Sequence, residues 1–319
     1  MTVKKFNYVK FIIFIVVLVA LIVGIIVGIV KFKKHLDYKK SYEYKLVTIG
    51  YSLDEVKILE GKLSNKYLDE ILTKNYIPLL AEFVSEKYFI YDNLEKYVEY
   101  KNDNKNTDNT KIVAIINTEA NIDWFDNEKE TDTSKGELML VNRLYGLNSE
   151  YEVEDIVSIP SRYAYSGKKI SESILPHIQD LIEEGRENGY TFVVSNGYRS
   201  YKEQASLYNS YANSYGKNEA DKNVARPGHS EYETGLSFDL VPYNKELRDP
   251  KSSDEYIWLR ENAHKYGFIF RFDADKEYLT GFEEFTWRLR YVGEEAATLI
   301  YNENICFEEY YAYFVGGER

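Results

Sequence analysis

Three segments of the sequence contain polar residues of the types found in binding sites. Arg199 and Gln204 lie in the first of them, and Ser230 and Asp239 lie in the second. A guanidinium presents planar donors that match a carboxylate, so a cleft that contains Arg199 could hold a terminal carboxylate. The segments are Ser195–Tyr201 with Gln204, Ala225–Asp239, and Thr280–Gly293.

The order and spacing of these segments resemble those of the VanY-type D-alanyl-D-alanine carboxypeptidases, zinc enzymes that trim peptidoglycan stem peptides. The resemblance covers about residues 136 to 300, and it implies an α+β domain of the VanY/LAS peptidase type. The mixture of predicted helices and strands, without strict alternation, also indicates an α+β fold. Further similar segments are Leu140–Asn142, Asp155–Val157 and Glu261–Phe268.

The resemblance implies a zinc site with two imidazoles, one carboxylate and a water in the fourth position. One His and the Asp come from the pattern Ser-x-His-x-x-Gly-x-x-x-Asp. The other His comes from Glu-Pro-Trp-His, in which the Glu is the general base that activates the metal-bound water. An Arg from the first segment stabilises the developing oxyanion.

The first metal-binding pattern is only partly present in this chain. Ser230 and Asp239 match it, but Tyr232 occupies the position of the first zinc-binding His. Arg199 matches the oxyanion Arg, and the resemblance places Arg199, Ser230 and Gln204 among the substrate-binding residues. Asp239 is therefore the one metal ligand that is retained.

The second pattern is replaced at its functional positions. Trp287 sets the register, which puts Phe285 at the general base, Thr286 at the Pro and Arg288 at the second His. Both imidazoles and the base are thus substituted, so zinc binding is doubtful and no intact catalytic residue is expected. The sequence predicts a pseudoenzyme.

The substitutions suggest that a cation of the protein replaces the metal. We predict an ion pair between Arg288 and Asp239, capped by the Tyr232 hydroxyl, because a buried unpaired carboxylate is costly. In the alternative, Arg288 points to solvent and Asp239 makes local backbone hydrogen bonds.

Other residues could in principle rescue a zinc site. His229, Asp239 and Glu284 form the alternative ligand set of an active zinc D,D-carboxypeptidase. We expect His264 to pack or face solvent. Cys306 is the one cysteine, which excludes an intrachain disulfide and predicts a buried thiol.

An uncharged apolar run from Phe11 to Val30 is long enough, at roughly 30 Å, to cross a bilayer. Its length and the lysines after it favour an uncleaved anchor over a signal peptide. The cation count would place the C-terminal side in the cytoplasm, whereas the family's substrate places it outside the cell membrane. We expect the outside location, in a Gram-positive bacterium.

The membrane anchor and the peptidase-like segment divide the chain into predicted parts. Ser52 and Glu55 have capping-box spacing for a helix from Leu53, and Ile112–Ile116 is predicted to be a strand. The parts are a cytoplasmic tail at 1–10, a transmembrane helix at 11–30, a stalk at 31–45, a helix-rich module at 46–135, and a carboxypeptidase-like domain at 136–319.

A net charge of −12 argues against a nucleic-acid partner. Three functions remain open. The first is a catalytically inactive cell-wall protein that binds peptidoglycan stem peptides ending in D-Ala-D-Ala. The others are an active zinc enzyme with atypical ligands, and a scaffold that binds cell-wall proteins through the 46–135 module.

Overall fold

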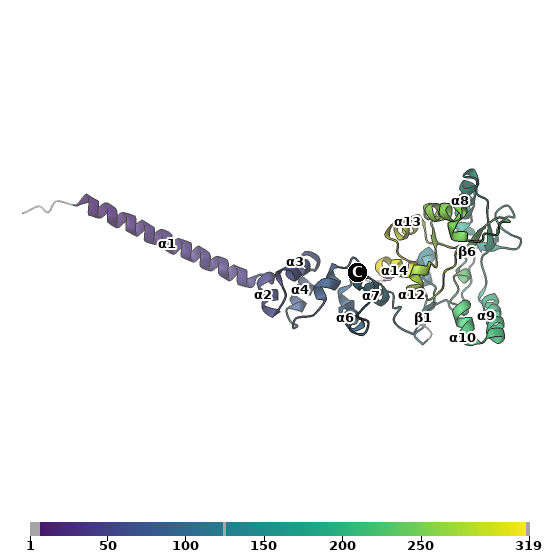
Figure 1. Ribbon diagram of the computed structural model, residues 1–319, viewed down its shortest axis with the longest axis horizontal. Coiled ribbons are helices and arrows are strands. Elements are labelled where there is room, and N and C mark those ends of the chain that lie inside the picture. Colours follow the sequence, from purple (N-terminus) through teal and green to yellow (C-terminus); the bar gives the residue numbers. More distant parts are fainter. Residues whose placement is uncertain (1–6, 124–125, 317–319) are drawn as a thin grey trace, which may run out of the picture. The chain divides into compact units, whose positions relative to one another are not determined.

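The computed structural model describes residues 7–123 and 126–316 (Figure 1). Contacts divide the chain into two compact units, residues 1–109 and 110–319. The predicted boundary at residue 135 and the other domain bounds stay predictions. Part of the predicted cytoplasmic tail, residues 1–6, lies outside the described residues, as do residues 124–125 and 317–319 of later parts.

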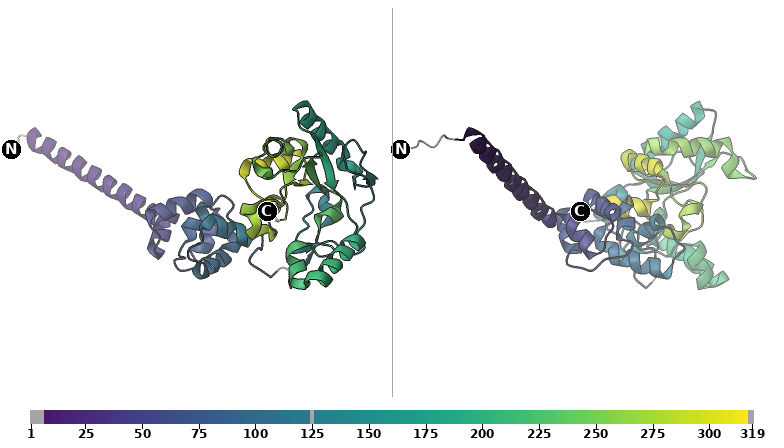
Figure 2. Two further views of the ribbon diagram at one scale, coloured as in Figure 1. Left: turned by 45° about the vertical axis from the view of Figure 1, so that its right-hand side comes forward. Right: turned by 60° about the vertical axis from the view of Figure 1, so that its left-hand side comes forward.

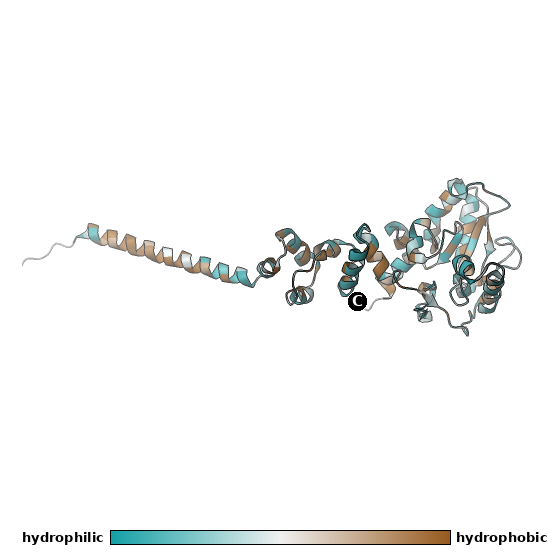
Figure 3. Cartoon of the chain, turned by 60° about the horizontal axis from the view of Figure 1, so that its bottom comes forward, coloured by the Kyte–Doolittle hydropathy of each residue, from teal (hydrophilic) through white to brown (hydrophobic). Residues whose placement is uncertain are grey.

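The apolar run forms most of helix α1, Tyr8–Lys40. By length and composition this helix could cross a membrane. Its hydrophobic colouring gives way to hydrophilic residues toward its C-terminal end (Figure 3). Ser41 ends α1 and caps the next helix, since its hydroxyl accepts a hydrogen bond from the Tyr44 N–H at 3.2 Å.

The rest of the first unit is a small helical bundle. The predicted capping box is confirmed, because the Ser52 N–H donates to Glu55 at 2.7 Å and the Glu55 N–H donates to Ser52 at 3.3 Å. Leu46, Leu59 and Ile71 are fully buried in its core. The helices are α2 (Tyr42–Ile49), α3 (Leu53–Lys62), α4 (Asn65–Ile71), α5 (Leu80–Ser85) and α6 (Leu94–Asp103).

The predicted strand at Ile112–Ile116 is wrong, because this segment lies in helix α7, Asn109–Asn117. All five of its apolar residues are buried. A helix that is buried on every side shows no amphipathic period, and its β-branched residues then resemble those of a strand.

The second unit is built on a four-stranded antiparallel sheet with the order β5-β6-β8-β7. Two pairs of short strands and several helices surround it, which confirms the α+β class. The sheet strands are β5 (Phe192–Asn196), β6 (Ser237–Pro242), β7 (Phe268–Phe270) and β8 (Arg288–Tyr291). The short strands are β1 (Lys129–Glu130), β2 (Tyr145–Gly146), β3 (Ile156–Ser158) and β4 (Lys169–Ser171).

The helices of this unit include a pair, α9 and α10, that lie side by side (Figure 2). Helix α9 ends at Tyr215, and Gly216 is its C-cap. The helices are α8 (Leu175–Glu187), α9 (Tyr201–Tyr215), α10 (Lys217–Asn223), α11 (Asp254–Asn262), α12 (Glu277–Thr280), α13 (Glu294–Glu303) and α14 (Phe307–Tyr310).

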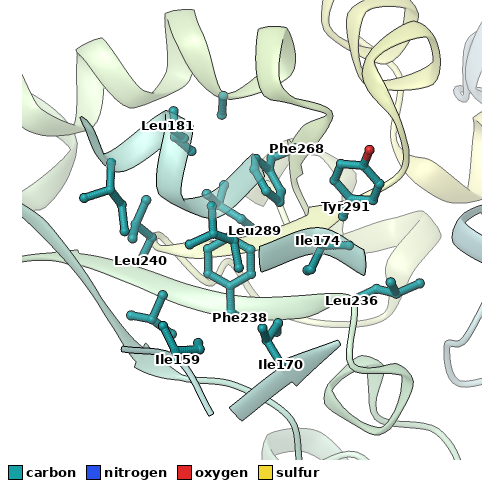
Figure 4. Packing of buried hydrophobic residues seen from close by; sticks show 14 of the residues in the cluster. Ile159, Ile170, Ile174, Leu181, Leu236, Phe238, Leu240, Phe268, Leu289 and Tyr291 are labelled. Atoms are coloured by element: carbon teal, nitrogen blue, oxygen red, sulfur yellow. The ribbon is translucent and has the colours of Figure 1, made fainter. Parts of the chain in front are cut away.

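One face of the sheet forms the hydrophobic core. Phe238 and Leu240 of β6 pack in one cluster with Leu289 of β8 and Leu181 of α8 (Figure 4). Because successive side chains of a strand point to opposite faces, Asp239 between them lies on the other face. The core packing therefore fixes which face of the sheet carries the polar site.

Candidate functional site

The pairing of β6 with β8 places Asp239 directly opposite Arg288. Arg288 Nε donates to Asp239 Oδ1 at 3.0 Å, and Asn196 Nδ2 donates to Asp239 Oδ2 at 2.8 Å. The predicted ion pair is thus confirmed, and the alternative of an Arg288 that points to solvent is wrong. Both carboxylate oxygens are held by cationic or amide donors.

Tyr232 completes this cluster from the short 3-10 helix η4, Glu231–Thr234. Its hydroxyl accepts a hydrogen bond from Arg288 Nη2 at 2.7 Å, as the ion-pair hypothesis expected. The guanidinium carbons of Arg288 and Arg199 lie 4.5 and 4.9 Å from the centre of the Tyr232 ring. Phe285 also contacts the guanidinium of Arg288, at 4.2 Å from its ring centre.

The charges of the cluster are consistent with this geometry. Burial alone would raise the pKa of Asp239, but the Arg288 charge and hydrogen bonds from its neighbours hold that pKa below its usual value. Burial raises the pKa of the Tyr232 hydroxyl. At neutral pH Asp239 is therefore an anion paired with the Arg288 cation, and Tyr232 is a neutral phenol.

These residues do not fit the zinc ion that the resemblance implies. Zinc is bound by imidazole, thiolate or carboxylate, whereas Asp239 here is joined by a phenol and a guanidinium that has no lone pair to give. Among the described residues, no group of three or more His, Cys, Asp or Glu could hold a metal ion.

The alternative zinc ligands make other contacts. His229 is buried, and its Nδ1 lies 2.7 Å from the Asn142 carbonyl oxygen while its Nε2 lies 3.1 Å from Glu128 Oε1. Glu284 forms an ion pair with Lys251. Both imidazole nitrogens and the Glu284 carboxylate thus have partners other than Asp239.

A cavity of about 180 Å³ lies beside the ion pair and is lined by the predicted substrate-binding residues. Arg199 Nη1 donates to Gln204 Oε1 at 2.7 Å, and Gln204 Nε2 donates to the Ala225 carbonyl at 2.6 Å. Gln204 therefore holds Arg199 in place. Ser230 also lines the cavity, and one wall is aromatic, formed by Phe272, Phe282 and Phe285.

A buried ionic network behind the site was not predicted. Arg271 donates to Glu231 at 2.6 Å and to Glu308 at 2.6 and 2.9 Å, and Arg290 donates to Glu231 at 3.2 Å. Arg271 and Arg290 are fully buried. The network links η4, the sheet and α14, so it supports the segment that carries Tyr232.

Two residues that sequence reasoning set aside have structural contacts. His264 stacks on Tyr301 with ring centres 4.0 Å apart, which confirms a packing role. Cys306 is a free, buried cysteine, and burial raises the pKa of its thiol. A buried neutral thiol is a poor nucleophile.

Replacing Arg288 by Met is expected to destabilise the second unit by about 3 kcal/mol, because the Asp239 carboxylate would remain buried without its cation. The double variant with Asp239→Asn should recover at least half of that loss. The measurement is urea unfolding followed by tryptophan fluorescence, since all three tryptophans follow residue 109. Equal losses in the single and double variants would contradict a coupled pair.

The carboxylate of Glu233 is expected to make stability depend on pH. It is buried and accepts hydrogen bonds from the Gly228 N–H at 2.9 and 3.1 Å and from the Ser230 N–H at 3.3 Å. Burial raises its pKa to about 7, against the opposing effect of these bonds and of Arg199.

The pKa of Glu233 is higher in the folded protein than in the unfolded chain, so a proton on this carboxyl stabilises the folded state. This stabilisation is complete below the unfolded-state pKa and is lost as the pH rises to about 7. We expect the free energy of unfolding to fall by roughly 1–3 kcal/mol between pH 5 and pH 7.5. The Glu233→Gln variant cannot ionise, so its decrease should be smaller. The same decrease in both proteins would exclude Glu233 as the cause.

The comparisons with known proteins all point to one family. The family model for D-alanyl-D-alanine carboxypeptidase, VanY, matches residues 167–294. A D-alanyl-D-alanine carboxypeptidase of Enterococcus faecalis is 34% identical over 192 residues, which are 57% of this chain and 68% of that protein. The putative carboxypeptidase YodJ of Bacillus subtilis is 30% identical over 228 residues, which are 67% of this chain and 84% of YodJ.

A solved structure supports the same assignment. The LdcB LD-carboxypeptidase, whose structure is described as revealing the molecular basis of peptidoglycan recognition, is 32% identical to this chain with a TM-score of 0.55. The match covers 60% of this chain and 93% of LdcB. With its α+β sheet and its similarity to these carboxypeptidases, this chain belongs to the VanY family of D-alanyl-D-alanine carboxypeptidases.

Proposed function

We propose that this protein is a membrane-anchored, catalytically silent carboxypeptidase relative that binds peptidoglycan stem peptides by their terminal carboxylate. The observation that supports the proposal most is the Arg288–Asp239 ion pair, 3.0 Å long, at the positions of two zinc ligands. A guanidinium bound to Asp239 cannot turn water into a nucleophile as zinc does. In this proposal the chain keeps the carboxypeptidase fold, and Arg288 takes the place of the zinc ion that hydrolysis requires.

The cavity beside the ion pair supports a binding role. Arg199 keeps the family position, and the hydrogen bond from its Nη1 to Gln204 leaves other guanidinium donors for a ligand. At about 180 Å³ the cavity is smaller than a typical small-molecule site of roughly 300–1,000 Å³. It would therefore hold the end of a peptide, with the carboxylate at Arg199 and an apolar side chain against Phe285.

The proposed location follows from the proposed ligand. Peptidoglycan lies outside the cell membrane, so the second unit would be extracellular and α1 would be a single-pass anchor. The five lysines between Lys31 and Lys40 favour the opposite orientation by charge alone. We propose the extracellular orientation because the proposed ligand lies outside the membrane, although the lysine count favours the opposite one.

A calorimetric titration of the full-length protein in detergent, with a stem peptide ending in D-Ala-D-Ala, tests the proposal. We expect saturable binding without release of D-alanine. The Arg199→Ala variant should bind at least tenfold more weakly, because it loses a charge-assisted hydrogen bond to the carboxylate, worth roughly 1.5–3 kcal/mol.

The same peptide with an amidated C-terminus is the matched control for carboxylate recognition. The amidated peptide should bind the unmodified protein weakly. Its affinity should be about that of the carboxylate peptide for the Arg199→Ala variant. If the unmodified protein shows no binding at millimolar peptide, or if it releases D-alanine, the proposed function is wrong.

A further inference from the structure

A second and larger cavity, of about 610 Å³, lies at the end of β6. Val241 and Pro242 line it, so the cavity lies at the end of the strand, two residues beyond Asp239. Two residues along a strand span roughly 7 Å. The second cavity therefore begins a short distance from the ion pair along β6.

Aromatic side chains form part of the lining of this cavity. Tyr165 lines it and is 38% exposed, and the neighbouring Tyr243 is 50% exposed. Their ring centres lie 6.2 Å apart with an angle of 34° between the ring planes. Trp287 also lines the cavity, and Tyr256 holds it by an edge-to-face contact at 5.6 Å.

The polar residues of the lining complement these rings. Asn244, Lys245 and Glu246 come from the turn after β6. Lys245 is paired with Glu255, so its charge is locally balanced. An amide and carboxylate next to aromatic faces favour a ligand that is largely uncharged, carries hydroxyl groups and has an apolar side.

Sugar rings have these properties. Their axial C–H bonds carry partial positive charge and pack on the electron-rich face of an aromatic ring, while their hydroxyls reach polar groups at the rim. The cavity volume also lies within the roughly 300–1,000 Å³ typical of small-molecule sites. A polyanion such as a nucleic acid does not fit this lining, because it needs clustered cations.

We propose that the cavity of Tyr165, Trp287 and the 244–247 turn binds a saccharide, namely the amino-sugar glycan to which the stem peptides are attached. The choice of this glycan rests on the proposed function, because the cavity lies two residues along β6 from Asp239 of the peptide site. The chain would then contact both components of peptidoglycan, the peptide at Arg199 and the glycan at Tyr165.

The test uses a peptide-free tetrasaccharide of the glycan strand and the full-length protein in a detergent without a sugar headgroup. Calorimetry should show saturable binding, and the double variant Tyr165→Ala, Tyr243→Ala should bind at least tenfold more weakly. The variant Tyr211→Ala, Tyr215→Ala removes another tyrosine pair, with ring centres 4.7 Å apart on α9, and should bind like the unmodified protein.

No saturable binding by the unmodified protein, or equal affinity in the Tyr165 and Tyr243 variant, would overturn the saccharide site. Circular dichroism of each variant shows whether the fold is kept, and binding of the stem peptide to the same variant gives a second measure of an intact site. Because the tetrasaccharide carries no peptide, failure of the peptide proposal and failure of the saccharide proposal give different results.

Discussion

Restoring the three family residues together, by Tyr232→His, Phe285→Glu and Arg288→His, is expected to produce a protein that binds one zinc ion per chain. The two imidazoles would join Asp239, which β6 already presents opposite position 288. The Asn196 amide, 2.8 Å from Asp239, would orient the carboxylate from behind. Zinc content by mass spectrometry after dialysis is the measurement.

Each single substitution provides a control for this result. With only Tyr232→His, the Arg288 guanidinium still occupies the Asp239 carboxylate, so zinc should stay far below one per chain. With only Arg288→His, one imidazole and one carboxylate make too few ligands for tight binding. Stoichiometric zinc in either single variant, or none in a folded triple variant, would contradict the proposal that these three substitutions prevent zinc binding.

The restored protein should also release D-alanine from a stem peptide. Glu at position 285 would supply the general base, and Arg199 would stabilise the oxyanion if it has the role that the resemblance implies. A chelator should abolish the release. The two substitutions Tyr232→His and Arg288→His without Phe285→Glu should bind zinc but cleave at least a hundredfold more slowly, following the roughly 10²–10⁴-fold contribution of a general base.

The second large effect is expected from Arg271→Met, which should destabilise the second unit by roughly 3–5 kcal/mol. Arg271 is fully buried and holds the carboxylates of both Glu231 and Glu308. Its removal leaves two buried anions with too few donors, and Arg290 reaches only Glu231 among them. Urea unfolding followed by tryptophan fluorescence measures the loss.

An exposed arginine is the matched control for this prediction. Arg162 pairs with Glu183 at 2.9 Å, but its side chain is 65% exposed. Surface pairs of this kind are screened by water and contribute little, so Arg162→Met should have a much smaller effect than Arg271→Met. Similar losses in the Arg271 and Arg162 variants would show that burial of the network contributes little to stability.

Local sequence signals predicted the elements that carry their own boundary residues. Ser52 and Glu55 predicted the start of α3, and a capping box of the same kind, Ser200 with Glu203, stands at the start of α9. Capping depends on residues three or four positions apart, so it is readable without the rest of the fold. The family motifs located Asp239 and Arg288, and charge complementarity then predicted their contact.

Features that depend on distant partners were not predictable in the same way. Ile112–Ile116 has the composition of a strand, although all five residues are buried in a helix. Glu308 contacts Arg271 across 37 positions of sequence, and neither residue stands in a recognisable motif. Arg and Glu usually lie at the protein surface, so the sequence gives no sign that these two residues are buried in the ionic network behind the site.

The zinc content of the unmodified full-length protein, expressed with excess zinc and dialysed, tests the central claim most directly. We expect far less than one zinc per chain, whereas a family member with both His residues, purified in parallel, should keep its metal. One zinc per chain that is lost on Asp239→Asn substitution would contradict it, because the metal and the Arg288 guanidinium cannot both occupy the Asp239 carboxylate.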